Sequence, residues 1–404
     1  MKYIIAIPDG ATDQLSAYPQ GDTPLRCADS PTMDALADHG EAGWAQTVPD
    51  SLPPGSDVAC LSIFGYDTTR IYTGRAPLEA ANMGIDLGDR TAFRCNLVTI
   101  EDGVMKEFTA GHITTEEAAD LIVSLNEQLG EDSIRFHTGV QYRHILTAPP
   151  DWNDVECTPP HDILDQEADK HLPQGLAALR VNNLMKRSRA VFADHPINRR
   201  RLAAGKPPAT QIWLWGQGTK PQLTTYQQRF GLSGGVISAV DLIQGIGRLA
   251  GLEVIQVPGA TGLMDTNYEG KAEAALRVLE NHPLVLVHVE STDEMGHAGD
   301  AERKTQAIRD FDQRLLKILV DGLRGRGEEF RLLLLPDHPT PIALRTHVNE
   351  PVPFLLYDSR SAEKRSGEGY SEWGVRSRTQ QTVVGHRLIE LLLEKAVFAD
   401  LLAM

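Results

Sequence analysis

Acidic and imidazole side chains follow several apolar stretches of this sequence. Three such stretches are residues 3–7, 284–289 and 332–335. Continuous apolar runs are typical of strands that are buried on both faces of a parallel sheet. Ligands in open α/β sheets bind at the carboxyl ends of the strands, so the side chains that follow these runs should meet at one edge. They are Asp9, Asp293, His297, Asp337, His338 and, after a short loop, His347.

This residue set predicts a metal centre. Three carboxylates and three imidazoles at one edge would repel one another or stand idle unless cations bound them. Asp293 and His297 are four positions apart, which places both side chains on the same side of a helical turn. Mixed oxygen and nitrogen donors suit Mn²⁺, Zn²⁺ or Co²⁺ rather than Ca²⁺ or Cu⁺. Six ligands exceed what one catalytic ion with an open position needs, so we expect two divalent ions.

A candidate nucleophile lies at Ser56, which follows Pro53, Pro54 and Gly55. The glycine permits a tight turn, and the serine could begin a helix. A serine in that position is most often a helix cap. It becomes a nucleophile where a divalent cation beside its oxygen lowers the cost of deprotonation. The sequence has no Gly-x-Ser-x-Gly elbow between a strand and a helix, no Walker A motif and no Gly-x-Gly-x-x-Gly after a strand. These absences disfavour triad hydrolases, P-loop proteins and dinucleotide binders.

Local groups of arginine are candidates for binding an anionic substrate. They include Arg75, Arg143 and Arg201, the last within the run of residues 199–201. Planar guanidinium groups suit bidentate binding of phosphate or carboxylate. The alternative is that such runs form a solvated, charged helix face.

Composition excludes several other classes of protein. The 404 residues are 41% hydrophobic and 23% charged, which is typical of a globular protein rather than a disordered or coiled-coil chain. The 39 Lys and Arg against 55 Asp and Glu give a net charge of −16, so we expect no nucleic-acid or membrane partner. The four cysteines lack a CxxC spacing, which favours free thiols. The short apolar N-terminal run is no signal peptide, and we expect a cytoplasmic protein.

The order of predicted elements favours an α/β fold with an insertion. A chain of this length exceeds the usual size of a single core. Helical patterns cover residues 30–40, 114–130, 271–280, 301–322 and 382–397, and further strand-like runs cover 212–215 and 352–357. The segment from about residue 88 to 208 contains three Pro-Pro pairs, at 149–150, 159–160 and 207–208, which mark loops or boundaries. We therefore expect a mostly parallel sheet flanked by helices, formed by residues 1–88 and 209–404, with a smaller α+β domain inserted at 89–208.

Taken together, these motifs resemble the alkaline phosphatase superfamily. Within it the chain is similar to the archaeal-type 2,3-bisphosphoglycerate-independent phosphoglycerate mutases. The likeness runs nearly from end to end and is far more specific than any one motif. It rests on Asp9-Gly10, Gly55-Ser56-Asp57, residues 72–75, Asp293 to His297, Asp337-His338 and His347, and on residues 23–25, 93–96, 159–162 and 213–216.

The resemblance implies a role for each of these residues. Ser56 would be the nucleophile that carries the phosphoryl group. The inserted domain would bind the phosphoglycerate, with Arg143 and Arg201 as contacts, and close over the metals as a lid. The enzyme would be a glycolytic isomerase with a small phosphorylated metabolite as its partner. One ion would be held by Asp9, Ser56, Asp337 and His338, and the other by Asp293, His297 and His347.

One departure leaves the substrate open. Mutases of this type usually place His four residues after the serine, and this chain has Cys60 there. The change is similar to a bacterial subgroup proposed to be homoserine kinases. We expect interconversion of 2-phosphoglycerate and 3-phosphoglycerate through a phosphoserine. The alternatives are a related phosphotransferase, a metal-dependent phosphatase of another small metabolite, or a non-catalytic protein that kept the fold.

Overall fold

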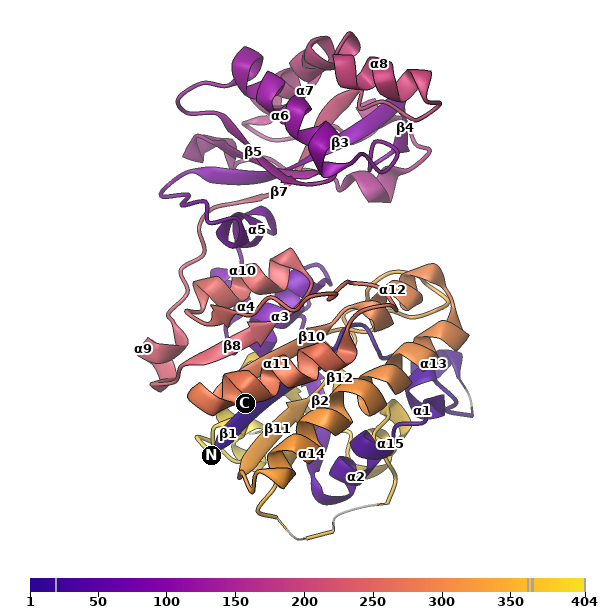
Figure 1. Cartoon of the computed structure of the whole chain (residues 1–404), viewed down its shortest axis with the longest axis vertical. Coiled ribbons are helices and arrows are strands. Elements are labelled where there is room, and N and C mark those ends of the chain that lie inside the picture. The colour runs from indigo at the N-terminus through magenta and orange to yellow at the C-terminus, as the bar shows by residue number, and fades with distance from the viewer. Residues whose placement is uncertain (19, 362, 365–366, 403–404) are drawn as a thin grey trace. The chain divides into compact units, whose positions relative to one another are not determined.

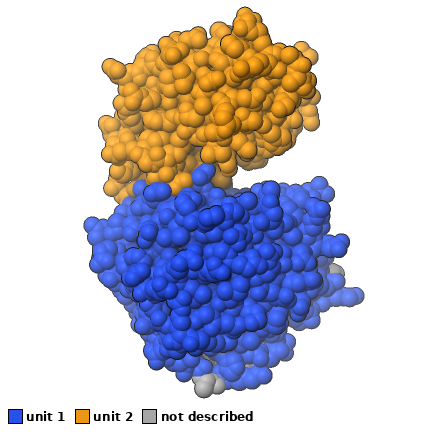
Figure 2. Space-filling model, in the orientation of Figure 1, with its two compact units in different colours: residues 1–72, 223–404 blue, residues 73–222 orange. Residues whose placement is uncertain are grey.

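The computed structural model describes the chain except for residues 19, 362, 365–366 and 403–404 (Figure 1). The chain divides into two compact units, which are coloured separately in Figure 2. Unit 1 comprises residues 1–72 and 223–404, and unit 2 comprises residues 73–222. Unit 2 is therefore an insertion into the sequence of unit 1.

Unit 1 is built on an eight-stranded sheet in the order β13-β2-β12-β11-β1-β10-β8-β9. Strand β12 runs antiparallel to both of its neighbours, and the other five pairings are parallel. The sheet is therefore mostly parallel, which confirms the predicted fold class. The strands are β1 (Lys2–Pro8), β2 (Glu41–Gln46), β8 (Gly234–Ile237), β9 (Glu253–Val254), β10 (Leu284–Val289), β11 (Phe330–Leu334), β12 (Val352–Asp358) and β13 (Thr382–Val384).

Helices bury one face of this sheet in a large apolar core. Ile4, Val285 and Leu332 of the central strands are each fully buried in it. The helical side of this core comes from α2 (Pro31–His39), α11 (Tyr268–Asn281) and the continuous run of α13 (Ala301–Asp310), the π-helical η5 (Phe311–Leu316) and α14 (Lys317–Gly325). Strands with no polar position on either face need such cover, which explains the continuous apolar runs in the sequence.

Unit 2 contains a five-stranded antiparallel sheet. Its order is β4-β3-β6-β5, with β7 pairing to the other side of β3. Thr114 and Glu117 form a capping box at the start of the helix α6. The strands are β3 (Thr91–Glu101), β4 (Val104–Glu107), β5 (Arg135–Val140), β6 (Arg143–Ala148) and β7 (Gln211–Gly218), and the long helices are α6 (Thr115–Leu129) and α7 (Ala178–Ala193).

The limits of the inserted unit differ from those expected at residues 89 and 208. Strand β7 pairs with β3 and so belongs to unit 2. The helix α5 (Ala76–Asn82) contacts both strands, and its Ala76 and Ala80 pack with Ala92 of β3. The proline pairs that suggested boundaries lie inside the unit, because its edge is set by strand pairing.

Three predicted elements also differ in detail. The apolar run at 212–215 lies in β7, which is antiparallel. The pattern at 301–322 is helical throughout but includes the π-helical turn η5. The expected helix at 382–397 is wrong: β13 occupies its start, and only α16 (Leu388–Leu392) is α-helical. Thr382–Val384 pairs with β2, so sheet formation outweighs the local helical pattern.

Candidate functional site

The carboxyl ends of three neighbouring parallel strands carry the candidate metal ligands of unit 1. Asp9 directly follows β1, and Asp337 with His338 lies just beyond β11. Asp293 lies in the first turn of α12 (Ser291–Ala298), which follows β10. Because β10, β1 and β11 are adjacent in the sheet, residues about 280–330 positions apart in sequence reach one edge.

One group of donors consists of Asp293, His297 and His347. The carboxylate of Asp293 lies 3.1 Å from His297 Nε2 and 3.5 Å from His347 Nε2. The two Nε2 atoms are 2.9 Å apart. His297 Nδ1 lies 3.0 Å from the carbonyl oxygen of Arg345, which orients the ring so that Nε2 faces the other donors.

The second group consists of Asp9, Ser56, Asp337 and His338. His338 Nε2 lies 3.2 Å from Ser56 Oγ, 3.3 Å from Asp337 Oδ2 and 3.7 Å from Asp9 Oδ1. The backbone N–H groups of Gly10 and His338 donate to Asp337 Oδ1. The other oxygen, Asp337 Oδ2, therefore faces His338 and the rest of the group.

The carboxylates of these two groups concentrate negative charge in a buried region. Burial, together with the charges of Asp337 and Asp293, raises the pKa of Asp9 well above its ordinary range. Burial lowers the pKa of His338 to about 4, so its ring is neutral and able to act as a ligand. Burial alone would lower the pKa of His297, but the hydrogen bond and charge of Asp293 outweigh it and raise that pKa to about 9.

These donors fit divalent cations. Asp9 Oδ1 is buried and has no hydrogen-bond partner among the described residues. Such an atom costs free energy unless a ligand satisfies it. Ligand atoms of Asp293, His297 and His347 lie within 4.8 Å of one another, as do those of Asp9, Asp293 and His338. Asp293 belongs to both of these sets. The sets therefore have the donor types and the spacing expected of two adjacent cation sites.

Ser56 does not cap its helix. It is the first residue of α3 (Ser56–Ile63), and the cap position is occupied by Gly55 without a side-chain hydrogen bond. The Ser56 hydroxyl is within 3.2 Å of His338 Nε2 instead. The helix thus presents the hydroxyl to the cluster of carboxylates and imidazoles.

Thr340, His288 and Glu290 also lie at this centre, although no motif in the sequence marks them. Thr340 donates to the carboxylate of Asp293 and lies 3.3 Å from His338 Nδ1. His288 and Glu290 are close to Asp9, and Cys60 Sγ is 3.7 Å from Asp337 Oδ2. The one available signal was His288, a single polar residue within an otherwise apolar strand.

In unit 2 the two predicted substrate arginines differ sharply. Arg143 is half-buried, and its Nε has no hydrogen-bond partner among the described residues. Arg201 is 1% exposed, and its guanidinium donates to Glu117 and to the carbonyl oxygens of Pro207, Ala110 and Gly111. All three nitrogens of Arg201 are thus used within unit 2. The predicted contact of Arg201 with substrate stays a prediction.

Arg143 belongs instead to a group with Arg75 and Arg94 around Glu79. Glu79 lies 3.1 Å from Arg75 and 2.9 Å from Arg94. Burial would raise the pKa of Glu79, but the charges of Arg94, Arg75 and Arg143 lower it. Arg94 also stacks over Trp215, 4.3 Å from the ring centroid. Three arginines with one carboxylate leave this group positively charged, which suits an anionic ligand.

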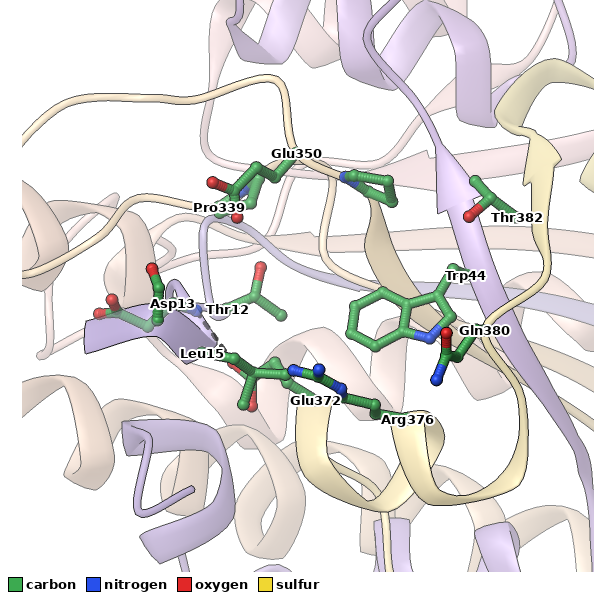
Figure 3. A pocket seen from close by; sticks show the side chains of 12 residues that line it. Thr12, Asp13, Leu15, Trp44, Pro339, Glu350, Glu372, Arg376, Gln380 and Thr382 are labelled. Carbon is green, nitrogen blue, oxygen red and sulfur yellow. Dashed lines mark hydrogen bonds between the residues drawn. The ribbon is translucent and has the colours of Figure 1, made fainter. Parts of the chain in front are cut away.

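A cavity of about 410 Å³ lies in unit 1 and is shown in Figure 3. Its walls include Trp44, Arg376 and Glu372, together with Thr12 and Pro339 of the loops beside the metal centre. None of the predicted metal ligands lines it. Glu372 is committed to Thr23 and to the backbone of Asp13, so its role in the wall is structural.

In the part of the chain that the structure describes, no helix is both long and apolar enough to cross a membrane.

A mostly parallel sheet with mixed carboxylate and imidazole donors and a serine at the strand ends is typical of a metal-dependent α/β enzyme.

Comparison with known proteins narrows this class. The family model described as 2,3-bisphosphoglycerate-independent phosphoglycerate mutase matches residues 37–198. The chain is 47% identical over 396 residues to the protein of that name from Methanosarcina acetivorans, covering 98% of this chain and 100% of the relative. It is also 47% identical over 404 residues to a probable mutase of this type from Geobacter sulfurreducens, covering 98% of this chain and 100% of the relative. The chain therefore belongs to the family of 2,3-bisphosphoglycerate-independent phosphoglycerate mutases.

Solved structures agree with this assignment. The PH0037 protein from Pyrococcus horikoshii matches with a TM-score of 0.80 and 27% identity, covering 98% of this chain and 99% of that one. The cofactor-independent phosphoglycerate mutase from Thermoplasma acidophilum matches with a TM-score of 0.64 and 25% identity, covering 98% of this chain and 100% of that one. The predicted family and fold are thus confirmed.

Proposed function

We propose that this chain interconverts 2-phosphoglycerate and 3-phosphoglycerate through a phosphoserine on Ser56 beside two divalent ions. The observation that carries the proposal is the contact of Ser56 Oγ with His338 Nε2, at 3.2 Å, within a cluster of buried carboxylates and imidazoles. Membership of the mutase family supports the choice of substrate.

The residues divide between the two ions as their contacts suggest. Asp9, Ser56, Asp337 and His338 would hold one ion, and Asp293, His297 and His347 the other. When bound, the ions supply positive charge that favours deprotonation of Ser56 and neutralises the phosphoryl oxygens. The ions are Mn²⁺ or Zn²⁺, with Co²⁺ as a third candidate, because these suit mixed oxygen and nitrogen donors.

The chemistry at Ser56 balances over two steps. Ser56 Oγ loses its proton and attacks the phosphorus in line, so that an Oγ–P bond forms. The bond between phosphorus and the glycerate oxygen breaks, and that oxygen takes up a proton. The other hydroxyl of the glycerate then loses its proton and attacks the phosphorus, the Oγ–P bond breaks, and Ser56 Oγ takes up a proton. No phosphoryl group is released as free phosphate in these two steps.

Unit 2 would supply the anion contacts of the substrate. Arg143, Arg75 and Arg94 are the residues we assign to the phosphate or carboxylate of phosphoglycerate, because their group is positively charged around Glu79. The guanidinium of Arg201 is hydrogen-bonded within unit 2, so the proposal does not assign it to the substrate. A cytoplasmic location remains part of the proposal.

A coupled assay tests the proposal. Protein treated with chelator is reloaded with Mn²⁺, Zn²⁺ or Co²⁺ and given 3-phosphoglycerate or, in parallel, homoserine with ATP. We expect mutase activity that chelation abolishes and at least one ion restores. Full activity in chelator, or phosphorylation of homoserine without mutase activity, would contradict the proposal.

A further inference from the structure

A fully buried histidine faces the metal centre from the strand next to Asp9. His288 lies in β10, where every other residue is apolar, and it is 0% exposed. The parallel register pairs it with Ile7 of β1, two residues before Asp9. A polar ring in such a strand requires partners, since an unsatisfied buried polar group is costly.

The hydrogen-bond partners of His288 favour one tautomer of its ring. Its Nε2 lies 2.9 Å from Asp9 Oδ2, and its Nδ1 lies 3.1 Å from Ser238 Oγ. Ser238 Oγ already accepts the N–H of Val240, so its own hydrogen is available for Nδ1. A neutral ring that accepts at Nδ1 carries its proton on Nε2 and donates it to the carboxylate. Ser238, His288 and Asp9 thus form a relay across the ends of β8, β10 and β1.

This relay sets the orientation of one carboxylate. Asp9 Oδ2 is occupied by His288, whereas Asp9 Oδ1 is buried without a partner among the described residues. We propose that His288 is a positioning residue, which holds Asp9 so that Oδ1 alone is presented to the ion shared with Ser56, Asp337 and His338. The inference rests on the proposed function, because it assumes an ion at that site.

A second arrangement is possible for the same atoms. Ligand atoms of Asp9, His288 and Glu290 lie within 4.8 Å of one another and could together bind a further cation. His288 Nε2 would then have to be unprotonated. Its 2.9 Å contact with Asp9 Oδ2 is a hydrogen bond in which Nε2 donates when Asp9 is ionised, and Glu290 Oε2 lies 4.0 Å away, beyond hydrogen-bond range. The contacts therefore favour positioning over ligation.

The first test is Mn²⁺ titration of the full chain, read by calorimetry and by metal content. Loss of an outer partner of a metal ligand typically costs about 10–100-fold in affinity, and we expect that loss at one of two sites in His288→Leu. His288→Gln retains an N–H donor and should recover most of the affinity. Ser238→Ala should weaken binding by a few-fold. His144→Leu removes another buried histidine, in unit 2, and should leave Mn²⁺ binding unchanged.

The outcomes separate this inference from the proposed function. Wild-type protein that binds no Mn²⁺ would overturn both. Two ions bound equally well by wild type and His288→Leu would overturn the positioning role alone. A third ion in wild type that His288→Leu loses would show that His288 is a ligand.

The second test is made on wild-type protein and needs a variant only to assign the signal. Nitrogen-15 NMR of histidine-labelled protein loaded with diamagnetic Zn²⁺ reports which ring nitrogen carries the proton, with His288→Gln used to assign the signal. We expect His288 to be protonated on Nε2 and unprotonated on Nδ1. The opposite tautomer would contradict the relay.

Discussion

The two units of this chain concentrate opposite charge. In unit 1 the carboxylates of Asp9, Asp293 and Asp337 are buried together at the end of a parallel sheet. In unit 2 Arg94 and Arg143 gather on the strands of an antiparallel sheet, with one carboxylate between the arginines. The first region is electrostatically incomplete without cations and the second suits anions. The residues of each unit are thus suited to a different part of the proposed ligand: the metal ions in unit 1 and the anionic groups of the substrate in unit 2.

The largest expected effect is in the metal region. Ser56→Ala removes the nucleophile but leaves Asp9, Asp337 and His338 to hold an ion. We expect folded, metal-containing protein with mutase activity lower by a factor on the order of 10⁴ or more. Ser62→Ala, buried in the same helix but outside the cluster, is the matched control and should retain activity. Substantial activity in Ser56→Ala would show that the serine is not the nucleophile.

His297→Ala should come next. It removes one of three donors of the second group, and the charge of that ion is worth several kcal/mol, or about 10²–10³-fold in rate. Metal analysis should show one ion lost or weakly held, with the fold intact. His282→Ala, outside the cluster at the end of α11, should keep both ions. Two tightly held ions in His297→Ala would remove His297 from the ligand set.

The arginine region should respond differently. Arg143→Met should raise the KM for phosphoglycerate about 10–100-fold, the value of a hydrogen bond to a charged group, and leave metal content unchanged. Arg201→Met should lower the Tm, because it leaves Glu117 and three carbonyl groups without their donor, while the KM of surviving protein stays near wild type. If the two variants behaved alike, the distinction between a substrate contact and a structural arginine would fail.

The smallest effect is a contrast in pH dependence between two histidines of metal-free protein. The pKa of His297 is raised to about 9, as burial is outweighed by Asp293, so its contribution to stability is complete below about 6.5 and lost as pH rises through about 9. Burial lowers the pKa of His144 to about 3, so its contribution holds above about 6.5 and falls with acid. NMR titration in chelator should resolve the two. Similar pKa values for both would contradict this electrostatic difference.

The candidate metal ligands of unit 1 could be predicted because one sequence pattern indicates both a buried strand and the ligands that follow it. An apolar run followed by Asp or His marks both a buried strand and its carboxyl end, and a parallel sheet brings such ends together whatever lies between them. The family and the fold class are confirmed, while the roles of Ser56 and the six Asp and His residues remain predictions that the geometry supports.

The grouping of the arginines and the unit boundaries could not be predicted from a local pattern of this kind. Arg94 and Arg75 come together with Arg143 only through strand pairing and the packing of α5, which no local pattern encodes. The run at 212–215 looks the same in a parallel and an antiparallel sheet, so β7 was assigned to the wrong unit. His288 is a single polar residue in an apolar strand, and its role depends on Asp9, which follows the neighbouring strand.

The central claim is a phosphoryl group carried by Ser56. The most direct measurement is peptide mass spectrometry of Mn²⁺-loaded protein that is mixed with 3-phosphoglycerate and quenched within a turnover. The account predicts a phosphorylated peptide that contains Ser56, formed with wild-type protein and absent with Ser56→Ala. Turnover without that phosphopeptide, or a phosphoryl group on another residue, would contradict it.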